Sequence, residues 1–310
     1  MGLSGFYQLL KKQYTPEMVN QDSLQGKTVA LDGDFVLYQA LHGYTRGEDV
    51  TPQEVASHIV KWLTKARLVG IQTIFVTTGG EAPAEKKDHC HQARKRKRQA
   101  QEANIQALEA TLSSRVLDKG DELVLREKVA RMKDQVRRVD SAMSTAVVAI
   151  LETSGFTCRS AVSEADFMLV MMSEDGTCDY VATDDSDIIV AGATKVLRGF
   201  VKLLTSNVDA RVYDRSDILK CLQLTSPQLL ELGCLLACDY QPKITNLGPV
   251  GALAVLLEFG DIASFLASEK FNTVLKNKKR KFSLPDEMDT AAYIRCSRRS
   301  VDIFLSRPDR

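Results

Sequence analysis

The stretch Thr28-Val-Ala-Leu-Asp32 decides the fold, because it is a short apolar run that ends in an acid. Such a run is typical of a strand buried in a sheet. Residues 53–66 follow with apolar side chains at helical spacing, and residues 71–76 form the next apolar run. A strand, a helix and a strand in this order predict a parallel sheet. Functional groups in such sheets gather at the carboxyl ends of the strands, where Asp32 lies.

The alternation of strands and helices continues along the chain. Further strands are expected at 156–159, 180–183 and 195–197, and a hairpin strand at 208–213. Further helices are expected over 83–114, 122–153, 164–172, 216–221, 226–238 and 248–259. Ser163 is the expected N-cap of the helix over 164–172. We therefore predict an α/β fold with helices on both faces of a parallel sheet.

The composition is that of an ordinary globular protein. The 310 residues are 44% hydrophobic and 26% charged, which excludes disorder, collagen-like repeats and a small disulfide scaffold. No apolar run approaches the roughly 18 residues that a membrane span needs. The chain starts without an apolar signal segment, and its seven cysteines include no Cys-x-x-Cys pair. We therefore expect an intracellular protein with reduced thiols and no membrane partner.

Charge is balanced overall but segregated along the chain. The net charge is +1, yet residues 86–98 hold seven basic residues and one acid. A second basic run lies at 276–281, and the acids gather at 164–166 and 184–187. Separate clusters of this kind can hold phosphates with one sign of charge and metal ions with the other.

Several acids lie where predicted strands or helices begin or end. They are Asp32, Asp34, Glu164, Asp166, Asp185, Asp187 and Asp239. Taken singly, each has an ordinary role as a helix cap or a solvated turn. Gathered at one end of a sheet they would repel one another, and divalent cations relieve that cost. Mg²⁺ prefers oxygen ligands, and two such ions about 4 Å apart stabilise both the attacking and the leaving oxygen in phosphodiester hydrolysis.

Six motifs, in order along the chain, resemble those of the flap endonuclease/XPG-type 5′-nucleases. Met1-Gly-Leu-Ser-Gly-Phe6 is similar to the family's Met-Gly-Ile-x-Gly-Leu. Ala182-Thr-Asp-Asp-Ser-Asp187 is similar to its Ala-Thr-Glu-Asp-x-Asp. The other four motifs are Val29–Asp32, Ser163–Asp166, Leu235–Tyr240 and Leu247–Pro249. Together the matches cover roughly residues 1–265.

The resemblance implies a fold and an activity. The fold is a parallel-sheet, PIN-like nuclease core with helices on both faces, a helical arch and a C-terminal helix–three-turn–helix. The activity is metal-dependent cleavage of DNA near junctions of single and double strands, as a 5′-flap endonuclease or 5′-exonuclease in replication, repair or recombination. We expect one nuclease domain over 1–310, comprising an N-terminal region (1–80), a basic arch (81–135), an internal region (136–240), a helix-hairpin element (241–265) and a C-terminal segment (266–310).

The resemblance also assigns the site carboxylates and their cofactors. The acids implied to hold metal and to serve catalysis are Asp32, Glu164, Asp166, Asp185, Asp187 and Asp239. The implied cofactors are two Mg²⁺ ions, which Mn²⁺ can replace. A K⁺ ion at the helix-hairpin loop is left open.

Contacts to DNA with a 5′ flap or free 5′ end are implied by the same comparison. The candidates to clamp the scissile phosphate are Lys87, Arg94 and Lys95. Tyr38 matches a tyrosine that stacks on a base near the cut, and Gly2 matches a glycine beside the substrate. The remaining DNA-binding candidates are Arg96, Arg98, Lys243, Gly248 and Pro249.

Three departures from the family pattern matter. Thr78 stands where the family has an aspartate, so a charge is lost, and Asp34 is the hypothesised compensation. The hairpin loop at 246–252 lacks the family's two basic residues, so Lys243 and the 276–281 run would have to supply that grip on the duplex. The sliding-clamp peptide that often follows the family's core is not seen, so we expect no recruitment to a sliding clamp through that peptide. We also expect a monomer.

Other interpretations stay open. The basic run at 94–98 suits DNA contacts, a nuclear localisation signal or a solvated helix, and we expect a nuclear protein. Thr78 leaves open a catalytically impaired relative that serves as a nucleic-acid-binding or scaffold module. A 5′-exonuclease acting on RNA is a further alternative. A nucleotide-binding protein is disfavoured, because neither Gly-x-Gly-x-x-Gly nor Gly-x₄-Gly-Lys-[Ser/Thr] occurs.

Overall fold

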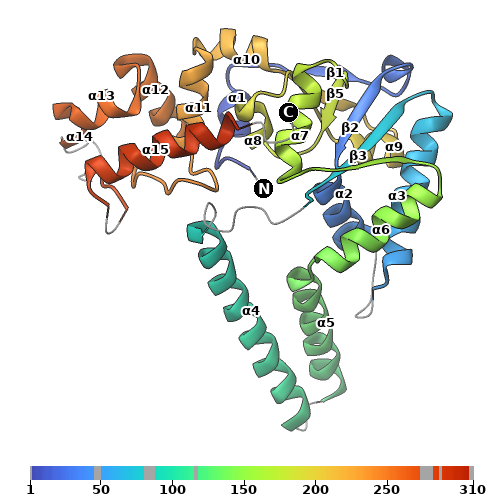
Figure 1. The fold of residues 1–310 in the computed structure, drawn as a ribbon. Helices are drawn as coiled ribbons and strands as arrows, with labels where there is room; N and C mark the ends of the chain where they lie inside the picture. Colours follow the sequence, from blue (N-terminus) through green and yellow to red (C-terminus); the bar gives the residue numbers. More distant parts are fainter. Residues whose placement is uncertain are drawn as a thin grey trace.

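The computed structural model describes residues 2–44, 50–79, 88–114, 118–272, 282–285 and 288–306. Its centre is a sheet with the strand order β1-β7-β6-β5-β2-β3-β4 (Figure 1). The strands are β1 (Glu17–Val19), β2 (Thr28–Asp32), β3 (Gln72–Thr77), β4 (Thr157–Ser160), β5 (Tyr180–Ala182), β6 (Lys195–Arg198) and β7 (Ala210–Asp214).

Helices precede, connect and follow these strands. They are α1 (Phe6–Leu10), α2 (Gly33–Gln39), α3 (Pro52–Leu68), α4 (Asp88–Ser114), α5 (Lys119–Val136), α6 (Ser141–Thr153), α7 (Ala165–Glu174), α8 (Asp187–Ala191), α9 (Phe200–Ser206), α10 (Arg215–Leu222), α11 (Ser226–Leu235), α12 (Pro249–Phe259), α13 (Ile262–Ala267), α14 (Glu269–Asn272) and α15 (Thr290–Phe304), with short helical turns η1 (Asp22–Leu24) and η2 (Ala40–Tyr44). Among the described residues, no helix is both long and apolar enough to cross a membrane.

The sheet is mostly parallel. Strands β2 to β6 pair in parallel, which confirms the α/β prediction for them. At one edge β7 runs antiparallel to β6, which agrees with the hairpin strand expected at 208–213. The short β1, which was not expected, runs antiparallel to β7. The connection from β6 to β7 over 199–209 is shorter than the dozen or more residues that a parallel crossover takes.

Alternate side chains of β2 enter two hydrophobic cores, one on each face of the sheet. Val29 and Leu31 belong to the core that also holds residues of α3, α6 and α9. Ala30 belongs to the core that also holds residues of α7, α8 and α11. A strand covered on both faces needs the continuous apolar sequence that marks β2. This burial fixes the place of Asp32, the last residue of β2, at the carboxyl edge of the sheet.

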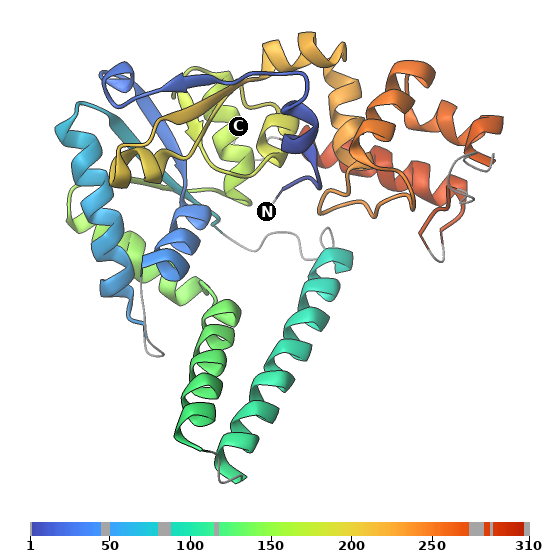
Figure 2. The same ribbon diagram turned by 180° about the vertical axis from the view of Figure 1, so that it is seen from behind.

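Helices α4 and α5 form a hairpin that projects from the body (Figures 1 and 2). The buried side chains of Ile105 and Val129 lie on these two helices, and Lys133 reaches Glu109 with an Nζ–Oε1 distance of 2.8 Å. The expected arch is therefore present. The single helix expected over 122–153 is wrong, because α5 ends at Val136 and α6 starts anew after Asp140, whose carboxylate accepts the amide N–H of Met143.

The C-terminal helices α11 to α15 gather on one side of the sheet (Figure 1). Helix α15 packs against α11 and α13. The fully buried Tyr293 donates its hydroxyl to the carbonyl of Pro242, 3.1 Å away. Since Pro242 follows the segment that carries Asp239, this packing supports one side of the candidate site.

Candidate active site

The predicted acids come from four elements at the carboxyl edge of the sheet. Asp32 ends β2, and Asp185 and Asp187 follow β5. Strands β2 and β5 are direct neighbours, with Leu31 paired to Ala182, so the acids that follow them lie side by side. The acids from the remaining two elements are Glu164 and Asp166 at the start of α7, and Asp239 beyond the end of α11.

Asp32 is held by two hydrogen bonds and is only 6% exposed. Its Oδ1 accepts the amide N–H of Phe35 at 3.0 Å, which caps α2. Its Oδ2 accepts the hydroxyl of Thr183 at 2.7 Å. Burial raises the pKa of Asp32 to about 6, against the lowering effect of these two bonds, and the charges of Asp34 and Asp185 raise it further. A cation placed beside this carboxyl would stabilise its ionised form, which burial and the neighbouring acids disfavour.

Thr183 and Asp185 link β5 to the start of α8. The hydroxyl of Thr183 accepts the amide N–H of Asp185 at 3.1 Å while it donates to Asp32. The Oδ1 atom of Asp185 accepts the amide N–H of Asp187 at 3.0 Å. Asp184 takes a different role, since its Oδ1 lies 3.4 Å from Nε of Arg198. A solvated turn is thus a poor description of this segment.

Asp187 is a buried acid with a raised pKa. Burial and the charge of Asp185 raise its pKa well above the ordinary value, with smaller contributions from Asp239 and Asp166. Its Oδ1 atom is buried and has no hydrogen-bond partner among the described residues. An unsatisfied buried carboxylate oxygen is costly, and a bound cation would satisfy it.

At the start of α7, Glu164 occupies the N-cap position, so the prediction of Ser163 as the cap is wrong. Glu164 is 6% exposed, and its Oε2 accepts the hydroxyl of Tyr240 at 3.1 Å. Burial, together with the charges of Glu164 and Asp166, raises the pKa of Tyr240, so its hydroxyl stays protonated and keeps donating. Tyr240 therefore connects α7 to the segment that carries Asp239.

Thr78, which replaces the family's acid, contacts the acid proposed to compensate for it. The Thr78 hydroxyl donates to Oδ2 of Asp34 at 2.6 Å, and the Thr78 amide N–H donates to the same atom at 3.2 Å. The hydroxyl also accepts the amide N–H of Ala165 at 3.2 Å. Thr78 therefore joins the first turn of α2 to the first turn of α7.

The donor set fits Mg²⁺ in its chemistry. All the candidate ligands are carboxylate oxygens, which hard divalent cations prefer, and Asp187 offers an oxygen without a donor. Over the residues that the structure describes, however, no three Asp, Glu, His or Cys side chains already stand in an arrangement that could hold an ion. Binding would therefore have to draw the carboxylates together by side-chain rotation.

The start of the chain forms part of the site wall. A Cβ atom on Gly2 would lie 2.5 Å from Oγ of Ser186 and 2.8 Å from Oδ1 of Asp185, and Gly2 has a φ of +103°. The amide N–H of Leu3 donates to Oγ of Ser186 at 2.7 Å. Only glycine fits this approach and this backbone conformation. Gly2 thus lies against Asp185 and Ser186, and its place beside a substrate stays a prediction.

The sequence-based interpretation missed the polar partners of the acids. Thr183, Ser186 and Tyr240 received no role, although each directly contacts the acidic cluster or its supporting backbone. The signal that could have found them is their position inside or next to the acidic motifs at 182–187 and 239–240.

Some of the predicted DNA-contacting residues lie in the described part of the chain, and others lie outside it. Lys95 and Arg96 are exposed on α4, and Nε of Arg98 lies 3.4 Å from Oε1 of Glu102 on the next turn. Tyr38 on α2 is 49% exposed, with its ring 4.2 Å from that of His42. Lys87, the side chain of Arg94 and the run at 276–281 lie outside the described part of the chain.

The helix-hairpin element lies close to the start of the chain. Gly248 is the N-cap of α12, and no atom lies within 4 Å of where its Cβ would be. A Cβ on Gly5 would lie 2.5 Å from Cγ of Pro249, so α1 and α12 meet closely at this point. Lys243, just before the element, is exposed. Their roles in DNA binding stay predictions.

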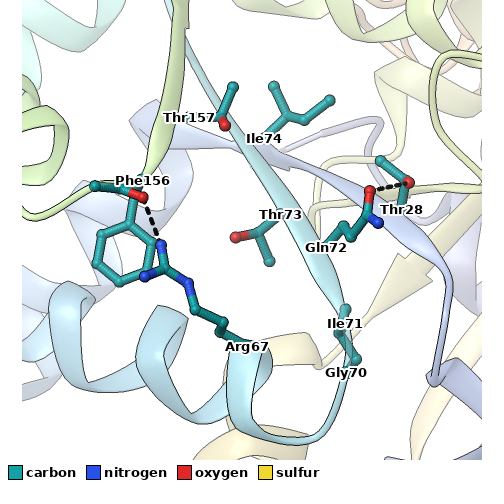
Figure 3. Close-up of a pocket in the computed structure, with 10 residues that line it drawn as sticks. Thr28, Arg67, Gly70, Ile71, Gln72, Thr73, Ile74, Phe156 and Thr157 are labelled. Atoms are coloured by element: carbon teal, nitrogen blue, oxygen red, sulfur yellow. Dashed lines mark hydrogen bonds between the residues drawn. The ribbon is translucent and has the colours of Figure 1, made fainter.

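A separate cavity of about 530 Å³ lies at the opposite edge of the sheet. Thr28, Gln72 and Thr157, the first residues of β2, β3 and β4, line it (Figure 3). The guanidinium of Arg67 lies 4.3 Å from the ring centre of Phe156 and donates to the carbonyl of Gly155. Its described lining residues include no acid, so the cavity is distinct from the acidic site.

Curated relatives of this chain are flap endonucleases. Flap endonuclease 1 from Entamoeba histolytica is 28% identical over 309 residues, which cover 94% of this chain and 78% of that protein. Flap endonuclease 1 from Trypanosoma cruzi is 27% identical over 281 residues, which cover 86% of this chain and 68% of that protein.

Solved structures share the fold. The catalytic core of Rad2 in complex with DNA substrate matches with a TM-score of 0.67 at 21% identity, over 99% of this chain and 87% of that chain. Flap endonuclease-1 from Methanococcus jannaschii matches with a TM-score of 0.58 at 19% identity, over 94% of this chain and 95% of that chain. The expected α/β nuclease fold is therefore confirmed.

Two family models match segments of this chain that together contain all the strands of the sheet. Residues 1–101 match the XPG N-terminal domain, and residues 155–239 match the XPG I-region. The first region carries Asp32 and Asp34, and the second carries the acids from Glu164 to Asp239. The two regions together span more than half of the chain, which therefore belongs to the XPG family of nucleases.

Proposed function

We propose that this protein is a structure-specific 5′-nuclease that cuts DNA with a 5′ flap or a free 5′ end, using Mg²⁺. The observation that carries the proposal is that Asp32, Asp185 and Asp187 lie together at adjacent strand ends, where burial and the charge of Asp185 raise the pKa values of Asp32 and Asp187. A protein has no reason to bury clustered acids at this cost unless a cation offsets their charge. The flap endonuclease relatives support the substrate class.

The residues of the acidic site would have different parts in this activity. Bound divalent ions would polarise the scissile phosphate and make a water molecule a better nucleophile. Asp32, Asp185 and Asp187 would hold those ions, together with acids supplied by α7 and by the segment after α11. Thr183 and Tyr240 fix the orientation of the carboxylates to which they donate.

The arch would supply basic side chains that bind DNA of any base sequence. Lys95 and Arg96 are exposed near the start of α4, the end of the arch that lies next to the N-terminus in both views (Figures 1 and 2). Basic side chains contact phosphates without reading bases. Specificity would then come from the shape of the junction and the passage of a free 5′ end. The same basic run would also serve nuclear import.

The test is cleavage of an end-labelled 5′-flap duplex with Mg²⁺. Asp185→Asn should lower the cleavage rate by about 100-fold or more, because removing one charge-stabilising group from a preorganised site costs that much. Asp217→Asn, a change on the surface of α10, is the matched control and should cut at the wild-type rate. A flap with a blocked 5′ end should be cut slowly if a free end must pass the arch.

Thr78 favours one alternative function, a catalytically impaired nucleic-acid-binding module. It predicts salt-sensitive binding of the flap duplex without cleavage in either Mg²⁺ or Mn²⁺. Cleavage of a 5′-labelled RNA strand in preference to the DNA flap would instead identify an RNA 5′-exonuclease. Wild-type protein that binds the DNA flap but leaves it intact under both metals contradicts the proposed activity.

A further inference from the structure

Asp34 and Thr78 form a bonded pair at the edge of the acidic site. Asp34 lies in the first turn of α2, two residues beyond Asp32, and Thr78 directly follows β3. Two donors of Thr78, its hydroxyl at 2.6 Å and its amide N–H at 3.2 Å, both point at Oδ2 of Asp34. Two bonds from one residue to one oxygen hold that carboxylate in a single orientation.

The hydroxyl of Thr78 has a second bond that sets its direction. A threonine hydroxyl has one proton to donate and lone pairs to accept with. Its oxygen accepts the amide N–H of Ala165, at the start of α7, at 3.2 Å. The proton must therefore point to Asp34. Valine in place of Thr78 would keep the shape of the side chain and remove both of these hydroxyl bonds.

Asp34 and Thr78 lie beside the acids of the site. Asp34 lies in the first turn of α2, the helix whose N-cap is Asp32. Ala165 lies between Glu164 and Asp166, two of the acids proposed to hold metal. Both bonds from Thr78 end on Oδ2 of Asp34, and within the described part of the chain its Oδ1 accepts no hydrogen bond, so that atom can serve as a ligand. The orphaned Oδ1 of Asp187 independently indicates that this cluster binds a cation.

We propose that Asp34 is a ligand of a divalent cation bound beside Asp32, and that Thr78 is the residue that positions it. The charge absent at position 78 is thereby supplied from α2, across the short gap between the ends of β2 and β3. Thr78 acts only through Asp34 and α7, so its hydroxyl is required and a charge at that position is not. This inference rests on the proposed metal-dependent function.

The first test measures Mn²⁺ binding by the electron paramagnetic resonance signal of the free ion. Thr78→Val should weaken Mn²⁺ binding by about tenfold, because loss of a positioning partner of a metal ligand costs roughly 10- to 100-fold. Asp34→Asn, which removes the ligand itself, should weaken it more. Thr78→Ser keeps the hydroxyl and should bind like wild type. Asp217→Asn is the matched control for loss of one acid. Equal Mn²⁺ affinity in wild type and Asp34→Asn overturns the inference.

The second test moves the carboxylate from the first turn of α2 to position 78, directly after β3. Asp34→Ser alone should lose Mn²⁺ affinity, and the double variant Asp34→Ser/Thr78→Asp should regain most of it. Circular dichroism melting confirms that each variant is folded. If Asp34→Ser binds like wild type while Thr78→Asp alone binds more tightly, the metal is held from β3 and Asp34 is not a ligand.

Failure of the inference and failure of the proposed function give different results. Wild-type protein that binds Mn²⁺ but does not cut the flap contradicts the nuclease activity, while the variants' affinities still decide the role of Asp34. Flap cleavage that is unchanged in Asp34→Asn, with unchanged Mn²⁺ affinity, overturns the role of Asp34 and leaves the nuclease standing.

Discussion

At the scale of single residues, small polar side chains hold the acids of the site in place. Thr183 joins Asp32 to Asp185, and Thr78 joins Asp34 to α7. The acids themselves were predictable, because each follows or precedes an apolar run that marks a strand or helix. Their threonine partners were not, because the bonds to Asp32 and Asp34 connect residues 151 and 44 positions apart. Contacts at that separation depend on the register of the finished sheet.

Asp179 illustrates how one carboxylate couples sheet stability to pH. Its Oδ2 accepts the amide N–H of Thr28 at 2.8 Å, and its Oδ1 lies 3.3 Å from Nζ of Lys27, where β2 begins. The bond from Thr28, followed by the charge and hydrogen bond of Lys27, lowers the pKa of Asp179. Ionised Asp179 therefore stabilises the folded state at every pH above the pKa that it has in the unfolded chain. This contribution is lost as the pH falls through the lower pKa that it has in the folded protein.

Asp179→Asn should accordingly lower the melting temperature at pH 7 and make little difference near pH 2. The measurement is thermal unfolding of both proteins across this range. The Glu258→Gln variant, which removes an exposed acid paired with Lys270 far from the sheet, controls for loss of one surface charge. A melting-temperature difference that stays constant with pH would show that the ionised form of Asp179 is not responsible.

At the scale of elements, most strands and helices of the sheet region were predictable, whereas β1 and the break between α5 and α6 were missed. The runs at 28–32 and 71–76 became β2 and β3 with small shifts. The three-residue β1 is too short to show a period, and it forms only because the edge of β7 is available. The break at 137–140 was hidden because Arg and Val suit a helix as well as a loop. Asp140, a strong N-cap residue, was the one available signal.

Asp140→Ala should remove the cap of α6 and lower the free energy of unfolding by about 1 kcal/mol, the usual cost of losing an aspartate N-cap. The bond at stake joins Oδ1 of Asp140 to the amide N–H of Met143 at 2.7 Å. Asp140→Asn, which can still accept this bond, is the matched control. Urea titration followed by circular dichroism measures both variants, and equal stability of Asp140→Ala and wild type would show that the cap carries no weight.

At the scale of the whole molecule, the α4–α5 hairpin stands apart from the body that carries the acids (Figures 1 and 2). Its helices are joined by the Lys133–Glu109 pair and by apolar residues, so it projects as one hairpin beyond the sheet. Its exposed Lys95 and Arg96 can contact phosphates without disturbing the acids on the body. Binding and cleavage should therefore respond to different substitutions.

Lys95→Ala/Arg96→Ala should weaken binding of a flap duplex and reduce the slope of log affinity against log salt by up to about 2, because each phosphate contact contributes about one unit. Arg126→Ala is the matched control, since this α5 arginine is already paired with Glu122 at 2.7 Å. Fluorescence anisotropy in Ca²⁺ at several salt concentrations measures the slope. An unchanged slope in the double variant would remove these residues from the DNA interface.

The close approach of Gly2 to Asp185 and Ser186 has a practical consequence for making this enzyme. The amide N–H of Leu3 donates to Oγ of Ser186, so residues 2 and 3 are held against the acidic site. An affinity tag or a leftover protease scar placed ahead of Gly2 would emerge beside the carboxylates. Preparations that differ in such residues should therefore be compared with one another before their kinetics are interpreted.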